Sequence, residues 1–141
     1  MQAIKSKNGW IAVDLDGTLA EYHGFVDAYH IGPPIPLMAQ RVRQWLDEGK
    51  DVRIFTARAD GGLAVSAEGN EAGQQFRDVA KVVANIQDWT EKHFGVRLPV
   101  TNAKDYAMVE LWDDRCKQVV KNTGEAIEEK LTRELRLNTA S

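Results

Sequence analysis

Two carboxylates separated by a single residue follow a short apolar run near the start of the chain. The run, residues 10–13, is followed by Asp14 and Asp16 with one leucine between them, and then by Gly17. A short apolar run that ends at a turn signal is typical of a buried strand in a parallel sheet. Ligands bind in the crevice beyond the carboxyl ends of such strands. Because alternate residues of an extended chain point the same way, both carboxylates are expected to face this crevice, where hard oxygen ligands suit Mg²⁺ and phosphate chemistry.

The pattern Asp-x-Asp-Gly also opens the calcium-binding loop of an EF-hand. Such a loop needs glycine at its sixth position and an acidic residue at its twelfth. Counted from Asp14, these positions hold Leu19 and Phe25. The sequence therefore excludes an EF-hand at this place.

The rest of the chain alternates between strand patterns and helix patterns, which predicts an α/β fold with a doubly wound parallel sheet and helices on both faces. Strands are predicted at 10–13, 51–55, 96–101 and 108–112. Helices are predicted from Pro36 to Gly49, over 76–94 and over about 123–137. The last helix has a narrow apolar stripe, so we expect it either to lie on the body or to form a dimer contact. Since no linker or repeat is present, residues 1–141 are predicted to form one domain.

Two segments without a regular pattern are expected to border the crevice. Residues 20–36, called the flap here, contain three prolines, which lack amide donors and prevent a continuous helix or strand. Residues 59–73 are rich in glycine but lack the spacing of a phosphate-binding P-loop, so a loop is predicted there. Both segments are too short to form a cap domain over the crevice.

Composition and charge limit the functional classes. The chain has 141 residues, 43% of them hydrophobic, which is enough for one domain with a real core. A net charge of −3 gives no electrostatic footprint for a long nucleic acid. The single cysteine, Cys116, excludes an internal disulfide and fits a reducing cytosol. Residues 1–8 lack the apolar core of a signal peptide, and no apolar run approaches the ~20 residues of a membrane span, so a cytoplasmic protein without a membrane partner is expected.

Three further patterns follow the first carboxylate pair in order along the chain. They are Ile-Phe-Thr-Ala-Arg at 54–58, Asn-Ala-Lys-Asp-Tyr-Ala at 102–107, and Trp-Asp-Asp-Arg at 112–115. Together with Asp-Leu-Asp-Gly-Thr at 14–18, they resemble the four motifs of the haloacid dehalogenase superfamily, in a small member without a cap. The resemblance implies that the first strand is central and is flanked by the strands that carry the second and fourth motifs.

The resemblance also implies an activity, namely Mg²⁺-dependent hydrolysis of a small phosphomonoester through an aspartyl-phosphate. It makes Asp14 the nucleophile and a metal ligand. It makes Asp16 the general acid for the leaving oxygen and then the base for the attacking water, with its backbone carbonyl on the metal. Asp113 is implied as the acidic metal ligand, and Asp114 as a second one that binds directly or through water.

The remaining motif residues are implied to bind the phosphate. Thr56 would donate hydrogen bonds to its oxygens, and Lys104 would hold Asp14 and the phosphate together as a point charge. Arg58 and Arg115 could steer an anionic substrate, with ion pairs to the acidic residues as the alternative use. Other candidates for the motif lysine are Lys81, Lys92 and Lys117.

Two other functions compete with a phosphatase for small substrates. Asp16 favours a phosphatase within the superfamily, because dehalogenases generally lack this residue and transport ATPases have threonine there. A non-catalytic module that binds Mg²⁺ or a phosphorylated ligand would keep the acidic residues without turnover. A phosphatase for nucleotides or nucleic-acid ends is the other alternative. The acidic balance disfavours nucleic acid, whereas base stacking on the aromatic residues of the flap would favour it.

Overall fold

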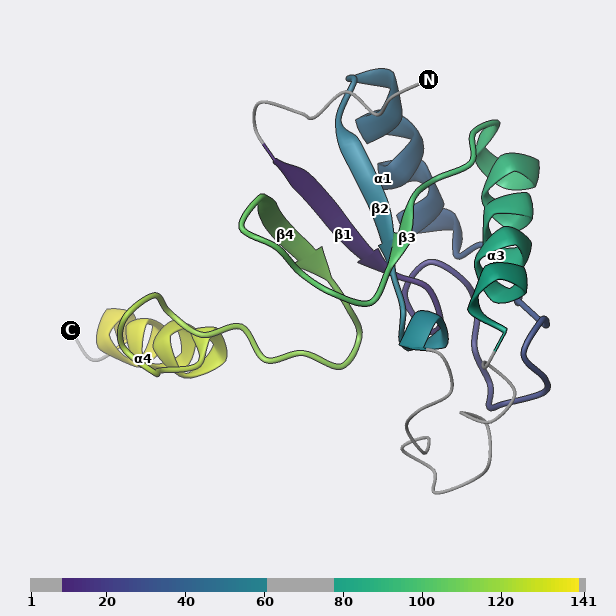
Figure 1. The fold of residues 1–141 in the computed structure, drawn as a ribbon. Coiled ribbons are helices and arrows are strands. Elements are labelled where there is room, and N and C mark those ends of the chain that lie inside the picture. Colours follow the sequence, from purple (N-terminus) through teal and green to yellow (C-terminus); the bar gives the residue numbers. More distant parts are fainter. Residues whose placement is uncertain (1–8, 61–77, 140–141) are drawn as a thin grey trace.

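A parallel four-stranded sheet forms the centre of the fold, which a computed structural model describes for residues 9–60 and 78–139 (Figure 1). The strands are β1 (Trp10–Asp14), β2 (Asp51–Phe55), β3 (Val100–Thr101) and β4 (Met108–Trp112). They lie in the order β3-β2-β1-β4, and every neighbouring pair is parallel. The predicted α/β class and parallel sheet are therefore confirmed, and β1 lies between β2 and β4 as expected.

The central position of β1 explains why its sequence is apolar without alternation. Its first four residues are all buried, whereas the edge strand β4 exposes its three middle residues. The side chains on both faces of β1 are thus buried, so each of them must suit a dry environment. Ile11 lies opposite Val52 and Val13 opposite Ile54, so these four branched side chains share one face of the sheet.

The helices begin and end where local signals place them. The helical elements are α1 (Pro36–Asp47), the 3-10 helix η1 (Ala57–Asp60) and α3 (Val79–Phe94). α1 begins with a proline, whose missing N–H is unneeded in the first turn, and Gly49 follows it with a φ of 77°. The carboxylate of Asp78 accepts a hydrogen bond from the Lys81 backbone N–H at 3.2 Å and caps α3. The start predicted for α3 at residue 76, and the glycine-rich loop from residue 61 onward, lie outside the described residues.

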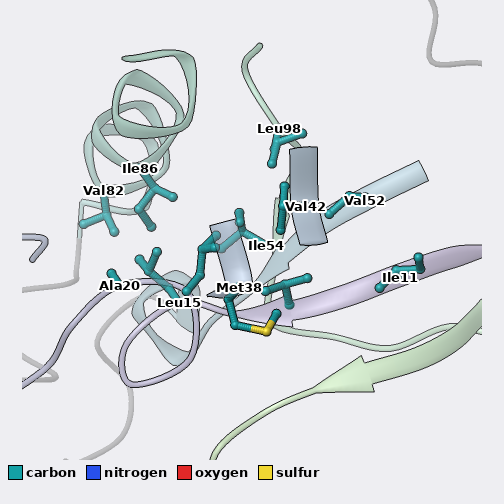
Figure 2. Packing of buried hydrophobic residues seen from close by; sticks show 12 residues of the cluster. Ile11, Leu15, Ala20, Met38, Val42, Val52, Ile54, Val82, Ile86 and Leu98 are labelled. Carbon is teal, nitrogen blue, oxygen red and sulfur yellow. The ribbon is translucent and has the colours of Figure 1, made fainter. Parts of the chain in front are cut away.

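The helices α1 and α3 pack on one apolar cluster beside the sheet (Figure 2). Met38 and Val42 of α1 join it, and so do Val82 and Ile86 of α3. The strand side chains in the cluster are Ile11, Val13, Val52 and Ile54. Since these share one face, α1 and α3 both contribute to the same side of the sheet. A doubly wound sheet with helices on both faces therefore stays a prediction.

The third strand is shorter than the sequence suggests. It was expected over 96–101, but only Val100 and Thr101 pair with β2. Pro99 has no amide donor, and the backbone N–H of Leu98 bonds to the hydroxyl of Thr90 on α3 at 3.0 Å instead of to a strand. A side-chain acceptor from a helix thus replaces strand pairing at the start of this segment.

The last helix, α4 (Ile127–Thr139), begins later than the predicted Thr123. The Thr123 N–H and hydroxyl both bond to the Val120 carbonyl, at 3.1 and 3.0 Å, and Gly124 has a φ of 77°, so these residues form a turn instead. α4 lies beyond β4, apart from α1 and α3, and contributes no buried residue (Figure 1). None of the described helices is both long and apolar enough to cross a membrane.

The flap has no helix of its own up to Pro36, as predicted, and it is tied to the body. The backbone N–H of Glu21 bonds to the Pro33 carbonyl at 2.9 Å and closes its base. Two side chains of α3 hold its backbone, because Asn85 donates to one flap carbonyl at 2.8 Å and Trp89 donates to another at 3.2 Å. The flap therefore has a defined position against α3.

The buried position of Ile54 leads to a prediction about stability. Ile54→Ala should lower the free energy of unfolding by about 2–5 kcal/mol, because it removes a fully buried side chain of β2 from the cluster that packs against α1 and α3. Urea unfolding followed by circular dichroism measures this change. Val109→Ala on β4 is the matched control, since Val109 is 56% exposed and the expected change is below about 0.5 kcal/mol. Equal losses in the two variants would contradict the described core.

Candidate active site

Three carboxylates meet at the carboxyl ends of β1 and β4. Asp14 is the last residue of β1, and Asp113 and Asp114 directly follow β4. One oxygen atom from each of the three lies within 4.8 Å of the others. The parallel pairing of β1 with β4, in which Val13 lies opposite Trp112, brings both strand ends to the same edge of the sheet. The structure thus gathers three of the four predicted acidic site residues, and we call these three the acid cluster.

The turn after Asp14 ties the acid cluster together. The Thr18 hydroxyl donates to Asp114 Oδ1 at 3.1 Å and accepts the Asp114 backbone N–H at 3.0 Å. It also lies 3.4 Å from Asp14 Oδ2, although its single proton serves one carboxylate at a time. Gly17 has a φ of 87°, and a Cβ atom there would lie 2.7 Å from Asp114 Oδ2. The turn therefore needs glycine both for its backbone angle and for the space beside Asp114.

Crowding changes the protonation of Asp14. Its burial is the largest cause, and the charges of Asp113 and Asp114 together with a hydrogen bond to Asp114 add to it, so that the pKa of Asp14 rises to about 8. Neighbouring carboxylates in a partly buried site cannot all ionise at low cost. Near neutral pH, Asp14 therefore either keeps a proton or needs a positive charge beside it.

Asp16 has a positive partner already. Its two carboxylate oxygens accept hydrogen bonds from Arg58 Nε at 2.8 Å and Nη2 at 2.9 Å. Arg58 is only 6% exposed, and it also donates to the flap carbonyls of Ala28 at 3.0 Å and His30 at 2.8 Å. Of the two uses that the sequence suggested for Arg58, the structure contains the ion pair. The same guanidinium fixes the flap to the strand end, and a bidentate pair of this kind is geometrically specific.

The predicted phosphate-binding residues differ in their surroundings. Thr56 directly follows β2, is 4% exposed, and accepts the Arg58 backbone N–H on its hydroxyl oxygen at 3.2 Å. Within the described part of the chain that hydroxyl donates to no acceptor. Lys104 lies in the exposed connection between β3 and β4 and forms no ion pair with a described residue. Two of the alternative lysines, Lys81 and Lys117, are engaged in ion pairs elsewhere.

A cavity of about 300 Å³ lies between Asp16 and the flap. Asp16 and Arg58 border it on the side of the sheet, and residues 21–24 together with His30 and Pro33 border it on the side of the flap. The acid cluster does not line this cavity. A ligand with one end at the acid cluster could therefore pass Asp16 and place its other end under the flap.

Two residues that the sequence reasoning did not single out also shape the site. One is Thr18, which belongs to the first sequence pattern but was given no role of its own there. The other is Asp105, whose Oδ1 accepts the Trp10 Nε1–H at 2.8 Å and the Ala107 N–H at 2.9 Å. An aspartate that bonds the backbone two residues ahead is typical of a turn, but its bond to β1 has no sequence signal. Asp105 fixes the connection that carries Lys104 against the central strand.

The donor set of the acid cluster is suited to a hard divalent cation. Carboxylate oxygens are the ligands that Mg²⁺ prefers in proteins. One oxygen of Asp113 accepts the Arg115 backbone N–H at 2.8 Å, which leaves its second oxygen for an ion. A cation here would also offset the repulsion that raises the pKa of Asp14. Asp14, Asp113 and Asp114 could therefore hold Mg²⁺.

The raised pKa of Asp14 predicts how stability depends on pH. A carboxyl group whose pKa is about 8 in the folded protein, against a usual 3.8, binds its proton more tightly when folded. Its contribution to stability is complete below the usual value and is lost as the pH rises toward 8. Asp14→Asn cannot ionise, so in the presence of chelator it should unfold at a higher temperature than the unmodified protein, and the difference should grow from pH 5 to pH 8.

Thermal unfolding of both proteins across this pH range measures the effect. The control is Asp47→Asn, at an exposed position of α1, which should leave the pH dependence unchanged. If Asp14→Asn and Asp47→Asn respond to pH in the same way, the electrostatic account of the acid cluster is wrong.

Comparison with known proteins adds no assignment to this geometry. No protein-family model, no curated protein and no solved structure matches the chain.

Proposed function

We propose that the chain is a Mg²⁺-dependent phosphomonoester hydrolase of the haloacid dehalogenase type, without a cap domain, that works through an aspartyl-phosphate. One observation carries this proposal, namely the meeting of Asp14 with Asp113 and Asp114 at the carboxyl ends of neighbouring parallel strands. Ligands of open α/β sheets bind at this edge, and a carboxylate cluster there can hold a cation that neutralises a phosphate. The order of the four sequence patterns and the central place of β1 support the same assignment.

Asp14 supplies the nucleophile. One of its carboxylate oxygens attacks the phosphorus, the bond between phosphorus and the leaving oxygen breaks, and the phosphoryl group stays on Asp14. Water then attacks the phosphorus, which releases inorganic phosphate and restores the carboxylate. Attack requires an ionised Asp14, although its pKa is raised to about 8. Bound Mg²⁺ would supply the positive charge that favours the ionised form and neutralises the phosphoryl oxygens.

Asp16 moves the protons of both steps. It gives a proton to the leaving oxygen in the first step and takes one from the attacking water in the second. Arg58 holds both of its oxygens, at 2.8 and 2.9 Å, and so fixes the plane of the carboxyl group. Each oxygen of a carboxyl group has a second lone pair, so a direction toward the leaving oxygen remains open. The side chain of Asp16 is 22% exposed, which leaves it accessible to substrate and water.

The other site residues bind the cation and the phosphate and orient them toward Asp14. Asp113 and Asp114, with the backbone carbonyl of Asp16, would hold Mg²⁺ together with Asp14. Thr56 donates its free hydroxyl proton to a phosphoryl oxygen, and its burial supports a fixed direction for that bond. Lys104 approaches from the connection between β3 and β4 and adds a positive charge beside the phosphate.

We also propose a more specific fold and a substrate class. The sheet is taken as the core of a doubly wound, Rossmann-like fold, which the position of β1 between β2 and β4 supports. The substrate is a small phosphorylated molecule, since the net charge of −3 disfavours polynucleotides. The absence of a disulfide partner for Cys116 supports action in the cytoplasm.

Metal removal gives the first test. Hydrolysis of a generic aryl phosphate should be lost after complete chelation and restored by Mg²⁺, because the acid cluster cannot accept a phosphate without a cation. Ca²⁺ should restore it poorly, since its larger and looser coordination misplaces the reacting groups. Full activity in chelator would remove the metal from the mechanism. Mg²⁺ or phosphate binding without any turnover would instead favour the non-catalytic module.

The second test separates Asp14 from Asp16, which have identical side chains but different proposed roles. Asp14→Asn should form no phospho-enzyme with any substrate. Asp16→Asn keeps the nucleophile and loses proton transfer, which typically contributes about 10²–10⁴-fold. The first step of Asp16→Asn should therefore survive with an aryl phosphate, whose leaving oxygen needs little protonation, and fail with an alkyl phosphate.

A burst assay with one aryl and one alkyl phosphate measures both variants, with circular dichroism as the folding control. Covalent phospho-enzyme in Asp14→Asn at the level of the unmodified protein would show that Asp14 is not the nucleophile. Equal losses of Asp16→Asn on both substrates in the first step would remove its role as the acid for the leaving group.

A further inference from the structure

We propose that the cavity between Asp16 and the flap receives the leaving group of the phosphomonoester, and that it selects an uncharged, ring-bearing group of the size of one nucleoside. This inference rests on the proposed function and names the substrate class of that site. The cavity begins at Asp16, the residue that protonates the leaving oxygen in the proposed reaction. Since the acid cluster lies outside the cavity, the phosphoryl group and the leaving group have separate places on either side of Asp16.

The size of the cavity limits the leaving group. Its volume of about 300 Å³ is at the small end of the range for ligand sites, which is roughly 300–1,000 Å³. One ring system with a sugar or a short chain fits such a space. A polynucleotide does not, and only its terminal nucleoside could enter.

The walls of the cavity favour a flat ring. Tyr22 and His23 line it from the first half of the flap, and His30 and Pro33 line it from the second half. Aromatic faces and a proline ring offer broad apolar surface on which a planar group can stack. Tyr22 is 37% exposed, so part of its ring is accessible to a ligand. The opposite side offers the polar groups of Asp16 and Arg58, which suit the oxygen-rich end of an alcohol.

The charges around the cavity disfavour a second anionic group. Arg58 already donates hydrogen bonds to Asp16 and to the carbonyls of Ala28 and His30, so few of its N–H groups remain for an anionic group of a ligand. Glu21 adds a carboxylate to the lining, and its Oε1 lies 3.5 Å from His23 Nε2. A leaving group that carries a carboxylate or a second phosphate would therefore meet a negative wall.

The flap that forms these walls is held in place by hydrogen bonds from Arg58 and from α3. Arg58 bonds the carbonyls of Ala28 and His30, and Trp89 on α3 donates to the Gly32 carbonyl at 3.2 Å. A Cβ on Gly32 would lie 2.2 Å from the Glu21 carbonyl oxygen, so the two arms of the flap touch there. The cavity therefore has fixed walls, which is the condition for selecting one shape of leaving group.

The first experiment compares uridine 5′-monophosphate with ribose 5-phosphate. Both lose the same primary alcohol oxygen and differ only in the base, so intrinsic reactivity is matched. We expect kcat/KM to favour the nucleotide by about tenfold, as is typical for stacking of one base. Tyr22→Ala should remove most of this preference by raising KM for uridine 5′-monophosphate. Its kcat for the nucleotide and its kcat/KM for ribose 5-phosphate should change little.

Tyr29→Ala is the matched control, because Tyr29 belongs to the flap and is 46% exposed but does not line this cavity. It should keep the preference for the nucleotide. Equal kcat/KM values for the two substrates, or equal effects of Tyr22→Ala and Tyr29→Ala, would overturn the inference while leaving the hydrolase proposal intact. A 3′-phosphorylated oligonucleotide that is hydrolysed far better than the corresponding mononucleotide would also overturn it.

A second comparison tests the role of charge. Glycerol 3-phosphate and 3-phosphoglycerate share a primary alcohol leaving oxygen, but the second carries a carboxylate on the leaving group. The unmodified protein should prefer glycerol 3-phosphate, and Glu21→Gln should reduce that preference by about 3–10-fold. If Glu21→Gln keeps the full preference for glycerol 3-phosphate, the Glu21 carboxylate does not repel an anionic leaving group.

Binding of uridine alone separates this inference from the proposed function. Saturation-transfer NMR should detect uridine on the unmodified protein and on Tyr29→Ala, and lose it with Tyr22→Ala. Uridine binding with this dependence in a protein that hydrolyses no phosphomonoester would refute the hydrolase and its leaving-group site together. Hydrolysis without Tyr22-dependent uridine binding would refute the ring-selective cavity alone.

Discussion

Repulsion among three carboxylates is the constraint on which the arrangement of the site depends. The pairing of β1 with β4 forces Asp14 toward Asp113 and Asp114, and the oxygens of the three lie within 4.8 Å of one another. The protein offsets this cost only in part, through the hydroxyl of Thr18 and the proton that Asp14 retains. A ligand that brings positive charge would offset the remaining repulsion.

Asp14 and Asp16 show how two identical side chains acquire different properties. Asp14 has carboxylates as its nearest charged neighbours, and its pKa rises to about 8. Asp16, two residues further along, has both oxygens bonded by the buried guanidinium of Arg58. Attack by Asp14 needs its ionised form and proton donation by Asp16 needs its protonated form, so the proposed roles require a positive charge beside Asp14 and a proton on Asp16.

The sequence predicted the parts of the fold that depend on local pattern. β1 and β4 follow from apolar runs that end in acids, and the meeting of Asp14 with Asp113 follows from the parallel order of their strands. Local pattern failed where a distant group replaced a local one. Thr90 on α3 takes the N–H of Leu98 that a longer β3 would have used. A hydrogen bond between a helix side chain and a distant backbone N–H leaves no helical or strand periodicity in the sequence, so the sequence pattern does not predict it.

Arg58 illustrates why the site could be predicted only in part. Its position after β2 indicated that it would lie near the acids, but its choice between substrate and ion pair depends on the flap, 28 residues away at His30. Once the flap carbonyls of Ala28 and His30 accept its hydrogen bonds, the guanidinium is fixed beside Asp16. A positive charge that is committed to Asp16 cannot also neutralise the acid cluster. The charge that Asp14 needs in order to ionise must then come from elsewhere, and an exposed lysine such as Lys104 is less effective than a cation held directly between the carboxylates.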